Sequence, residues 1–384
     1  MPPARKLQWI ELSQKALHKN IQSLASLAPN KVLAVCVKSN AYGHGITEIV
    51  KILLDNPQVS YLTVHSMREA IKCRRAGWRK QIMLLGPVEL CDTDAVLEFD
   101  IEPVVFNVKF LENIGKRADK FDRVVKTHLK LETGTNRQGI IEKDIAKFAS
   151  VYKKYKSLGK PYGASTHFAN IEDTTNHEYA EYQLSQFQHL LKVLANNEIE
   201  PEIKHTASSA ATILFEKTHF DMVRPGISVY GYWPSKETYL SHKLDGGKNN
   251  LFEPVLSWKS RVTQIKHVEA DSFISYGCTY QTTAKSKIAI IPVGYYDGYC
   301  RALSNKSYVL INGKRAPIRG RVCMNLMMAD ITDIPNVSLE NEVTLLGCEE
   351  KEEISANKLA DWANTINYEI LACLSGEIYR EIVQ

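Results

Sequence analysis

The sequence lacks any hydrophobic run long enough to cross a membrane, and it lacks the pattern of a signal peptide. No window approaches the roughly 18 consecutive apolar residues that a transmembrane helix requires. The first residues, MPPARKLQWIELSQKAL, contain no apolar stretch followed by a small-residue cleavage site. We therefore expect a cytoplasmic protein that does not associate with membranes.

Patterns typical of metal sites and of disulfide frameworks are missing as well. The eight cysteines lie at positions 36, 73, 91, 278, 300, 323, 348 and 373, and no two of them form a CxxC pair. This spacing fits neither a zinc site nor a small disulfide-bonded domain. We expect no metal, and we expect most of the cysteines to be reduced and buried.

A basic block of the kind that follows a phosphate backbone is also absent. The 48 lysine and arginine residues are interleaved with 43 aspartate and glutamate residues, and the net charge is only +5. Nucleic acid is therefore not an expected partner. The 384 residues exceed what one ordinary core requires, so two domains are expected.

Between residues 30 and 225, eight short apolar runs alternate with helical patterns. Such β-branched runs, separated by helices, are typical of a parallel sheet that is buried on both faces. Eight repeats predict a (β/α)8 barrel of the TIM type, and the lack of a GxGxxG turn after the first run disfavours an open doubly wound sheet. The runs are KVLAVCVK, SYLTVHS, QIMLLG, IEPVVF, VVKTHLKLE, PYGASTHF, EIKHTAS and FDMVRPG.

The pattern changes after the polar segment 235–254, which we interpret as a linker or surface excursion. Segments 255–268, 287–295 and 342–347 have strand character, and Asn312-Gly313 within 307–318 indicates a hairpin. One amphipathic helix is expected over 354–366. We therefore predict an α/β protein with a barrel domain at 1–240, whose first residues can pack on the next domain, and a mostly-β domain at 241–384.

Lys38 stands at the end of the first apolar run, where a barrel strand reaches the active-site face. Burial at that position lowers the pKa of a lysine, as imine-forming amines require. Position alone favours the plainer interpretation, a lysine whose stem packs on the barrel while its charge reaches water.

The segment VLAVCVKSNAYGHG resembles the cofactor-lysine motif of the alanine racemases. The resemblance implies that Lys38 carries pyridoxal 5'-phosphate as a Schiff base and that Tyr42 contacts the phosphate. Without the motif, Tyr42 would be taken for a core residue.

HLKLETGTNRQG resembles a second motif of the same family. It implies that Arg137 binds the substrate carboxylate and the phenolic oxygen of the cofactor, a task that suits a planar guanidinium. The matching Lys130 is often carbamylated in the family and then positions the arginine. Glu132, Thr135 and Asn136 depart from the usual Asp and Met-Gly, so the backbone of this loop is expected to differ.

ASTHFAN and HTASSAA resemble two further motifs. They imply that His167 bridges an arginine and a catalytic tyrosine, and that Ser209 binds the phosphate, with Ser208 in place of the usual asparagine. On its own, a histidine at a strand end is usually a satisfied core residue.

DMVRPGISVYG resembles the Val-Arg-Pro-Gly motif and adds Arg224, Gly226 and Ile227 to the expected cofactor site. Gly226 allows close backbone approach, so that amides there can donate to phosphate. The resemblance places Arg224 at the pyridine nitrogen, which a permanently protonated side chain leaves unprotonated. We expect this to limit delocalisation into the ring and to suppress transamination.

Motifs in the last third resemble the C-terminal part of the family. SYGCTY provides Tyr276 as the second catalytic base, PVGYYDGY provides Tyr295 at the substrate entrance, and TINYEILACLS provides Tyr368 near the phosphate. Without the family, these tyrosines would be ordinary strand residues.

GRVCMNLMMADI provides Met324, whose backbone amide is expected to contact the substrate carboxylate. Asn325 and Leu326 replace the usual Asp and Gln in this segment. Together with Thr135, these departures leave open a racemase for serine or for many amino acids, because one group in a small pocket discriminates only modestly.

The resemblance implies racemisation of L- and D-alanine by two bases on opposite faces of the substrate, supplying D-alanine for peptidoglycan. Lys38 serves the D isomer and Tyr276 the L isomer. A free phenol has a pKa of about 10, so the His167–Arg224 pair is expected to assist Tyr276. The family also implies a homodimer with shared active sites. Alternatives are a fold-related decarboxylase, disfavoured by the lack of a Gly-Gly-Gly run, and a non-catalytic cofactor-binding protein.

Overall fold

The structure is a computed structural model that describes residues 6–247 and 249–384. Residues 1–5, part of the segment in which no signal-peptide pattern was found, and residue 248 of the expected linker lie outside the described residues. The chain packs into two compact units. The barrel unit comprises Ala16–Ser39 and Ile49–Glu253, and the β unit comprises the chain up to Lys15, Asn40–Glu48 and Pro254–Gln384. The compact units therefore do not follow the predicted division at residue 240. The domain boundary at 240 stays a prediction.

Eight parallel strands in the order β8-β7-β6-β5-β4-β3-β2-β9 form the centre of the barrel unit. Each arises from one of the eight predicted apolar runs. The amide of Asp221 donates to the carbonyl of Lys204 (3.0 Å) and that of Arg224 to Ala207 (2.9 Å), which joins the two end strands. The predicted TIM-type barrel is therefore confirmed. The strands are β2 (Val32–Cys36), β3 (Val59–Val64), β4 (Gln81–Leu84), β5 (Glu102–Val105), β6 (His128–Lys130), β7 (Gly163–Ser165), β8 (Ile203–His205) and β9 (Met222–Val223).

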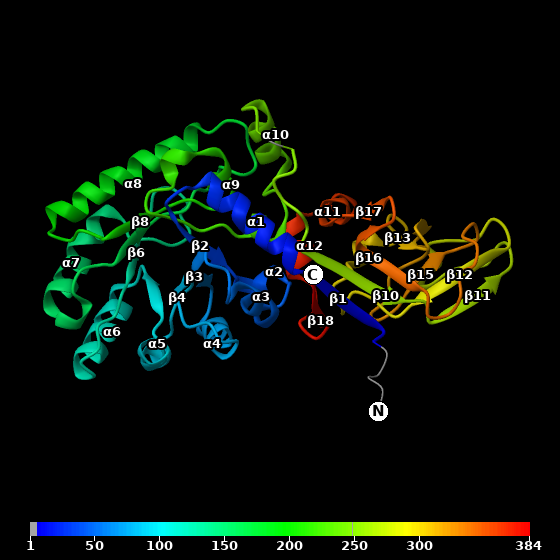
Figure 1. Ribbon diagram of the computed structural model, residues 1–384, viewed down its shortest axis with the longest axis horizontal. Helices are drawn as coiled ribbons and strands as arrows, with labels where there is room; N and C mark the ends of the chain where they lie inside the picture. The colour runs from blue at the N-terminus through cyan, green and yellow to red at the C-terminus, as the bar shows by residue number, and fades with distance from the viewer. Residues whose placement is uncertain (1–5, 248) are drawn as a thin grey trace. The chain divides into compact units, whose positions relative to one another are not determined.

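Helices lie around the outside of these strands (Figure 1). Their starts follow local sequence rules. Ser66 and Glu69 form a complete capping box at α4, and Asn107 caps α6. The helices are α1 (Gln14–Leu27), α3 (Ile46–Leu53), α4 (Met67–Arg75), α5 (Thr93–Glu98), α6 (Val108–Lys120), α7 (Ile145–Lys154), α8 (Glu178–Asn196), α9 (Ser209–Leu214) and α10 (Lys236–Leu244). None of the helices in the described part of the chain is long and apolar enough to span a membrane.

Helix α10 occupies the first half of segment 235–254, which favours the surface excursion over the linker for this half. This half is helical because Ser235 caps the helix, its hydroxyl accepting the amide of Thr238 at 2.9 Å. Within α10 only Thr238 and His242 are buried, and the other side chains are exposed or half-buried, so a polar composition suits this helix as well as a linker.

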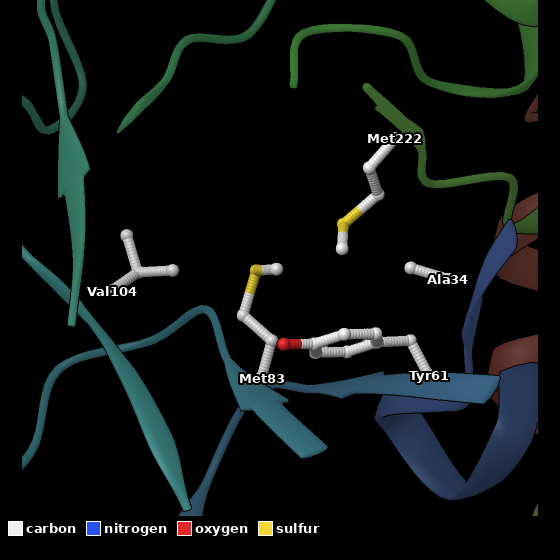
Figure 2. Close-up of a cluster of buried hydrophobic side chains, with 5 residues drawn as sticks. All are labelled: Ala34, Tyr61, Met83, Val104 and Met222. Carbon is white, nitrogen blue, oxygen red and sulfur yellow. The ribbon is translucent and has the colours of Figure 1, made fainter. Parts of the chain in front are cut away.

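The barrel interior is packed with side chains. Figure 2 shows Ala34, Tyr61, Met83, Val104 and Met222, from five different strands, converging on one buried cluster. Such a filled interior is typical of TIM-type barrels and gives a rigid base for residues at the strand ends.

The β unit contains two mainly antiparallel sheets, which confirms the predicted mostly-β C-terminal part. One has the order β14-β13-β16-β10-β1-β18, with β17 paired to β16, and the other has the order β11-β12-β15. The elements are β1 (Gln8–Ser13), β10 (Leu256–Arg261), β11 (Gln264–Val268), β12 (Ser286–Ile291), β13 (Tyr308–Ile311), β14 (Lys314–Pro317), β15 (Met327–Asp330), β16 (Glu342–Glu349), β17 (Glu352–Ile354), β18 (Tyr379–Val383), α11 (Ala356–Ala363) and α12 (Asn367–Ala372).

The predicted hairpin joins β13 and β14 through Asn312 and Gly313. Their φ angles are +51° and +69°, the left-handed region that a tight hairpin turn demands. The predicted helix in this unit is confirmed as α11.

All eight cysteines are free thiols, but the expectation that most are buried is wrong. Only Cys36 and Cys73, both in the barrel unit, are buried, because they lie on a strand and on the inner face of a helix. The exposed thiols are Cys91, Cys278, Cys300, Cys348 and Cys373.

Candidate active site

Lys38 follows strand β2 and begins the short helical turn α2 (Lys38–Tyr42). Ser39, Asn40, Ala41 and Tyr42 have φ angles of +54°, +54°, +55° and +52°, so the turn is left-handed. Four consecutive L-residues in this region are costly, which indicates that surrounding contacts hold the turn in place.

Helix α4 anchors the start of this turn. The amide of Ser39 donates to Oε1 of Glu69 at 2.6 Å, while Oε2 of the same carboxylate accepts the amide of His65 at 2.8 Å. Glu69 is also the acidic member of the α4 capping box. Lys38 is half-buried, and its backbone position is thus fixed by a helix end.

The barrel unit brings together five of the predicted site residues. His167 lies just beyond β7, and burial lowers its pKa well below the ordinary value. Four neighbouring cationic side chains lower it further, in decreasing order Lys130, Arg224, Arg137 and Lys38. His167 is therefore a neutral imidazole close to several basic side chains.

Lys130 is the last residue of β6. Burial lowers the pKa of its amine well below the ordinary lysine value, and the charges of Arg224 and Arg137 lower it further, against the opposing charge of Glu132. A neutral amine at physiological pH is a nucleophile, whereas an ammonium group is not.

The loop that carries Arg137 is held by its own side chains. The carboxylate of Glu132 accepts the amides of Gly134 (2.7 Å) and Asn136 (3.0 Å). Asn136 has a φ of +53°, a conformation that asparagine tolerates better than most residues. These two departures from the family motif thus support each other within one loop.

Thr135, the other departure, ties the loop to the next strand end. Its hydroxyl donates to the carbonyl of His167 at 2.6 Å. The amide of Gln183, on α8, donates to Thr133, Thr135 and the same carbonyl at 3.2–3.3 Å. Gln183 is fully buried, and it was not identified from the sequence because a glutamine within a helix gives no signal.

Arg224 follows β9 and is only 9% exposed. Its Nη1 donates to Nδ1 of His205 at 2.6 Å, and its Nη2 donates to the carbonyls of Thr166 (3.0 Å) and Thr206 (3.3 Å). Burial lowers the pKa of Arg224 to about 10, so the guanidinium remains charged at neutral pH. The predicted pairing of His167 with Arg224 remains a prediction, because the hydrogen-bonded imidazole is that of His205.

Three further polar residues extend this contact across the barrel. Nε2 of His205 lies 3.0 Å from Nδ1 of His128, and Nε2 of His128 lies 3.1 Å from Oε2 of Glu102. The hydroxyl of Tyr61 donates to the same carboxylate oxygen. These residues were not singled out from the sequence, although a glutamate and two histidines inside buried strands are a signal that can be read without a structure.

Two of the residues predicted to bind phosphate, Ser209 after β8 and Gly226 after β9, are hydrogen-bonded to each other. Oγ of Ser209 accepts the amide of Gly226 at 2.9 Å and that of Ser228 at 3.4 Å. With its lone pairs engaged, the hydroxyl of Ser209 directs its proton to another acceptor. The amide of Gly226, which was expected to donate to phosphate, is thus used within the chain, and Ile227 begins the following buried turn.

Tyr42 and Tyr368 lie together in the β unit. Their ring centroids are 6.1 Å apart at an interplanar angle of 48°. Tyr42 is 8% exposed. The structure thus brings together two side chains that the motifs assign to the same phosphate.

Tyr276, also in the β unit, is 72% exposed. It lies in a turn where Ser275 and Gly277 have φ angles of +66° and +71°. The hydroxyl of Ser275 donates to the carbonyl of Arg321 at 2.7 Å, which fixes the turn while Tyr276 projects outward.

Tyr295 and Met324 are brought together by backbone hydrogen bonds. The amide of Tyr295 donates to the carbonyl of Cys323 (3.1 Å), and that of Tyr296 donates to Met324 (3.0 Å). Tyr295 and Met324 are 42% and 54% exposed. Several of the predicted residues of the β unit therefore present large apolar surfaces to solvent in the single chain.

Within residues 6–247 and 249–384, no group of three or more His, Cys, Asp or Glu side chains could hold a metal ion. The chemistry available at the barrel mouth is that of amines, guanidinium groups and imidazoles. Such a set binds anions and moves protons.

Two family models match the chain, the alanine racemase N-terminal domain over residues 12–234 and the alanine racemase C-terminal domain over residues 255–382. The alanine racemase of Leptospira interrogans serovar Lai is 38% identical over 377 residues, covering 98% of this chain and 95% of that protein. That of Halothermothrix orenii is 39% identical over 376 residues, covering 97% and 96%.

Solved structures agree with this similarity. Alanine racemase from Bacillus anthracis with bound L-Ala-P has a TM-score of 0.91 and 33% identity, covering 100% of this chain and 96% of that one. Alanine racemase from Clostridium difficile 630 has a TM-score of 0.90 and 29% identity, covering 99% and 96%. Sequence, fold and motifs agree over nearly the whole length, and this chain belongs to the alanine racemase family.

Proposed function

We propose that this chain binds pyridoxal 5'-phosphate and interconverts L- and D-alanine. The observation that carries the proposal is the gathering of Lys38, Lys130, Arg137, His167 and Arg224 at one end of the barrel. The guanidinium groups of Arg137 and Arg224 favour anionic ligands, and both a phosphorylated cofactor and an amino-acid carboxylate are anionic.

The residues present fit the proposed cofactor. Lys38 would hold its aldehyde, the proton of Ser209 is directed outward to an acceptor such as phosphate, and Arg224 is a buried donor without basic capacity. When bound, the group delocalises the electron pair left after an α-proton is removed. The assignment of Tyr42, Tyr368 and Ile227 to the phosphate rests on the motifs.

In this proposal, the side chains orient the substrate and move its proton. Arg137 holds the carboxylate, so that the bond to the α-hydrogen has a fixed direction. Lys38 takes or returns the proton on one face, and Tyr276 on the other. The neutral imidazole of His167 can accept or donate a hydrogen bond near these groups.

A homodimer with shared active sites forms part of the proposal. Tyr276 is 72% exposed and Met324 54% exposed, although each is assigned to substrate chemistry that requires exclusion of water. Large exposed apolar side chains at catalytic positions are consistent with completion by a partner subunit. Tyr295, assigned to the substrate entrance, is also a large exposed side chain.

Carbamylation of Lys130 is the proposed state of this residue. Its lowered pKa favours the neutral amine, which can add to carbon dioxide. The resulting anion would lie between Arg137 and Arg224, the two cations that act on Lys130 most strongly, and would orient Arg137.

A second candidate, racemisation of serine or of several amino acids, is supported by the altered segment around Met324. Asn325 and Leu326 are both exposed there, so their side chains are available to a substrate or a partner. A cytoplasmic location and a role in supplying D-alanine for peptidoglycan complete the proposal, and the eight free cysteines are consistent with a reducing compartment.

A racemisation assay with purified protein and a panel of L-amino acids tests the proposal. We expect alanine to react fastest, and we expect cofactor absorbance that is lost in Lys38→Ala but kept in the exposed control Lys31→Ala. Loss of carbon dioxide from the substrate, or no change of its configuration, would contradict the proposal. Faster turnover of serine would support the second candidate.

A further inference from the structure

The guanidinium of Arg224 carries a positive charge, and none of its hydrogen-bond partners carries a negative charge. It is a buried cation, and its three hydrogen-bond partners are a histidine nitrogen and two backbone carbonyls. A buried charge without a counter-charge is strongly unfavourable, so nearby anions are expected, of which the proposed carbamate on Lys130 would be one. Burial also lowers the pKa of His205 well below its usual value, which leaves that partner neutral.

The donor and acceptor of each hydrogen bond in the series from Arg224 to Glu102 follow from the chemistry of the two end groups. Arginine only donates, so Nδ1 of His205 must accept, and the proton of His205 resides on Nε2. That proton is directed at Nδ1 of His128, so the proton of His128 also resides on Nε2. His128 then donates to Oε2 of Glu102.

The carboxylate of Glu102, at the other end of this hydrogen-bonded series, requires the same donor and acceptor assignment. Oε2 of Glu102 also receives the hydroxyl proton of Tyr61, so it acts as an acceptor toward both partners. Glu102 is 6% exposed and His128 is fully buried, so little solvent screens the carboxylate. An arginine at one end and a carboxylate at the other thus fix both imidazoles in one tautomer.

We infer that Glu102 is a positioning residue for the reaction, which acts through His128 and His205 to supply the counter-charge of Arg224 and to fix the direction of its guanidinium. The inference rests on the proposed function where it assigns Arg224 to the cofactor ring. The residues belong to strands β5, β6 and β8 and to the end of β9, so the rigid barrel wall sets their spacing.

Successive hydrogen bonds in such a series polarise one another. A change of charge at Glu102 therefore alters the hydrogen bond between His205 and Arg224 without moving the backbone. Glu102→Gln keeps the shape and an acceptor oxygen but removes the charge. Tyr61→Phe removes one donor to the carboxylate and keeps the charge. Comparing the two separates a role of the charge of Glu102 from a role of its hydrogen bond with Tyr61.

The first test measures the histidine tautomers directly. The full chain is labelled with ¹⁵N-histidine, with and without pyridoxal 5'-phosphate, and long-range ¹H–¹⁵N correlations are assigned with His128→Gln and His205→Gln. We expect both imidazoles to be neutral and protonated on Nε2. A proton on Nδ1 of either residue, or a doubly protonated ring, overturns the inference.

The second test measures the consequence at Arg224. We expect pyridoxal 5'-phosphate to bind roughly tenfold more weakly to Glu102→Gln than to the exposed control Glu98→Gln, as loss of a charge-assisted interaction predicts. We also expect kcat to fall with KM for alanine nearly unchanged. Tyr61→Phe should remain within about threefold of wild type, since it removes a donor to the carboxylate but leaves the charge of Glu102 in place.

The outcomes separate this inference from the proposed function. Equal cofactor affinity and equal kcat in Glu102→Gln and Glu98→Gln overturn the role of Glu102, even if the wild-type protein racemises alanine. If the wild-type protein does not bind the cofactor, the proposed function fails, and the tautomers still decide whether the hydrogen-bonded chain has the inferred direction.

Discussion

The hydroxyl of Thr135 donates a hydrogen bond to the carbonyl oxygen of His167 over 2.6 Å. This contact joins the loop after β6, which carries Arg137, to the end of β7. The two residues come from different predicted motifs, and the contact shows that one departure from the family pattern has a structural partner.

Replacing Thr135 by valine keeps the shape and removes this donor. We expect KM for alanine to rise about fivefold, because one lost hydrogen bond of about 1 kcal/mol loosens the loop that holds Arg137. Steady-state kinetics with Thr135→Ser as the matched control provide the measurement. An unchanged KM in the valine variant would show that the loop is held without Thr135.

Lys130 is expected to react with carbon dioxide. The amine nitrogen bonds the carbon and releases one proton, which requires the neutral form that the lowered pKa favours. With ¹³C-labelled bicarbonate we expect one carbamate signal in the NMR spectrum that is absent from Lys130→Met and present in the exposed control Lys126→Met. The signal should weaken as the pH falls, because protonation removes the nucleophile. Its persistence in Lys130→Met would place the adduct on another lysine.

The fully buried His44 gives a prediction about stability and pH. Burial lowers its pKa from 6.5 to about 4, so the folded state resists protonation that the unfolded state accepts. Below pH 6.5 the unfolded chain binds the extra proton, and stability is therefore lost as the pH falls toward 4. From pH 7 to pH 5 this amounts to about 2 kcal/mol.

Urea unfolding at both pH values measures this effect. His44→Asn keeps a donor for the carbonyl of Tyr42, which Nδ1 of His44 contacts at 2.9 Å, and it does not titrate. We expect the difference in unfolding free energy between pH 7 and pH 5 to shrink by about 2 kcal/mol in the variant. The variant His267→Asn, at an exposed position, is the matched control.

The proposed shared active sites predict complementation between two inactive proteins. Lys38→Ala lacks one base and Tyr276→Phe lacks the other, so a hybrid dimer would contain one intact site if the two bases come from different subunits. We expect activity to return after the two variants are unfolded and refolded together. A purified hybrid that stays inactive would show that both bases belong to one chain.

The barrel could be predicted from the sequence because each strand is a short apolar run followed by a helical pattern. Strand β2 is the clearest case, since four of its five residues are buried. The β unit was harder to predict at its ends. Strands β1 and β18 pair with each other in parallel, with Trp9 opposite Tyr379, and a pairing over such a sequence distance leaves no local signal.

Much of the candidate site could also be predicted, but only as separate motifs. The sequence identified Lys130, His167 and Arg224 individually, and in the structure Lys130 and Arg224 lie near enough to His167 to lower its pKa together with burial. It did not identify Glu102 as a partner of Arg224, because the connection passes through two imidazoles on different strands. Long-range hydrogen-bonded chains depend on the spacing of the barrel wall, which no local pattern encodes.

The left-handed turn that begins at Lys38 has a consequence for the chirality of the chain itself. Each L-residue in such a turn costs roughly 1–2 kcal/mol, and the φ angles of Ser39–Tyr42 lie between +52° and +55°. A D-residue prefers this mirror-image backbone. In a chemically synthesised chain, D-alanine at position 41 would therefore fit the turn, whereas the same exchange within a right-handed helix such as α1 would disrupt it.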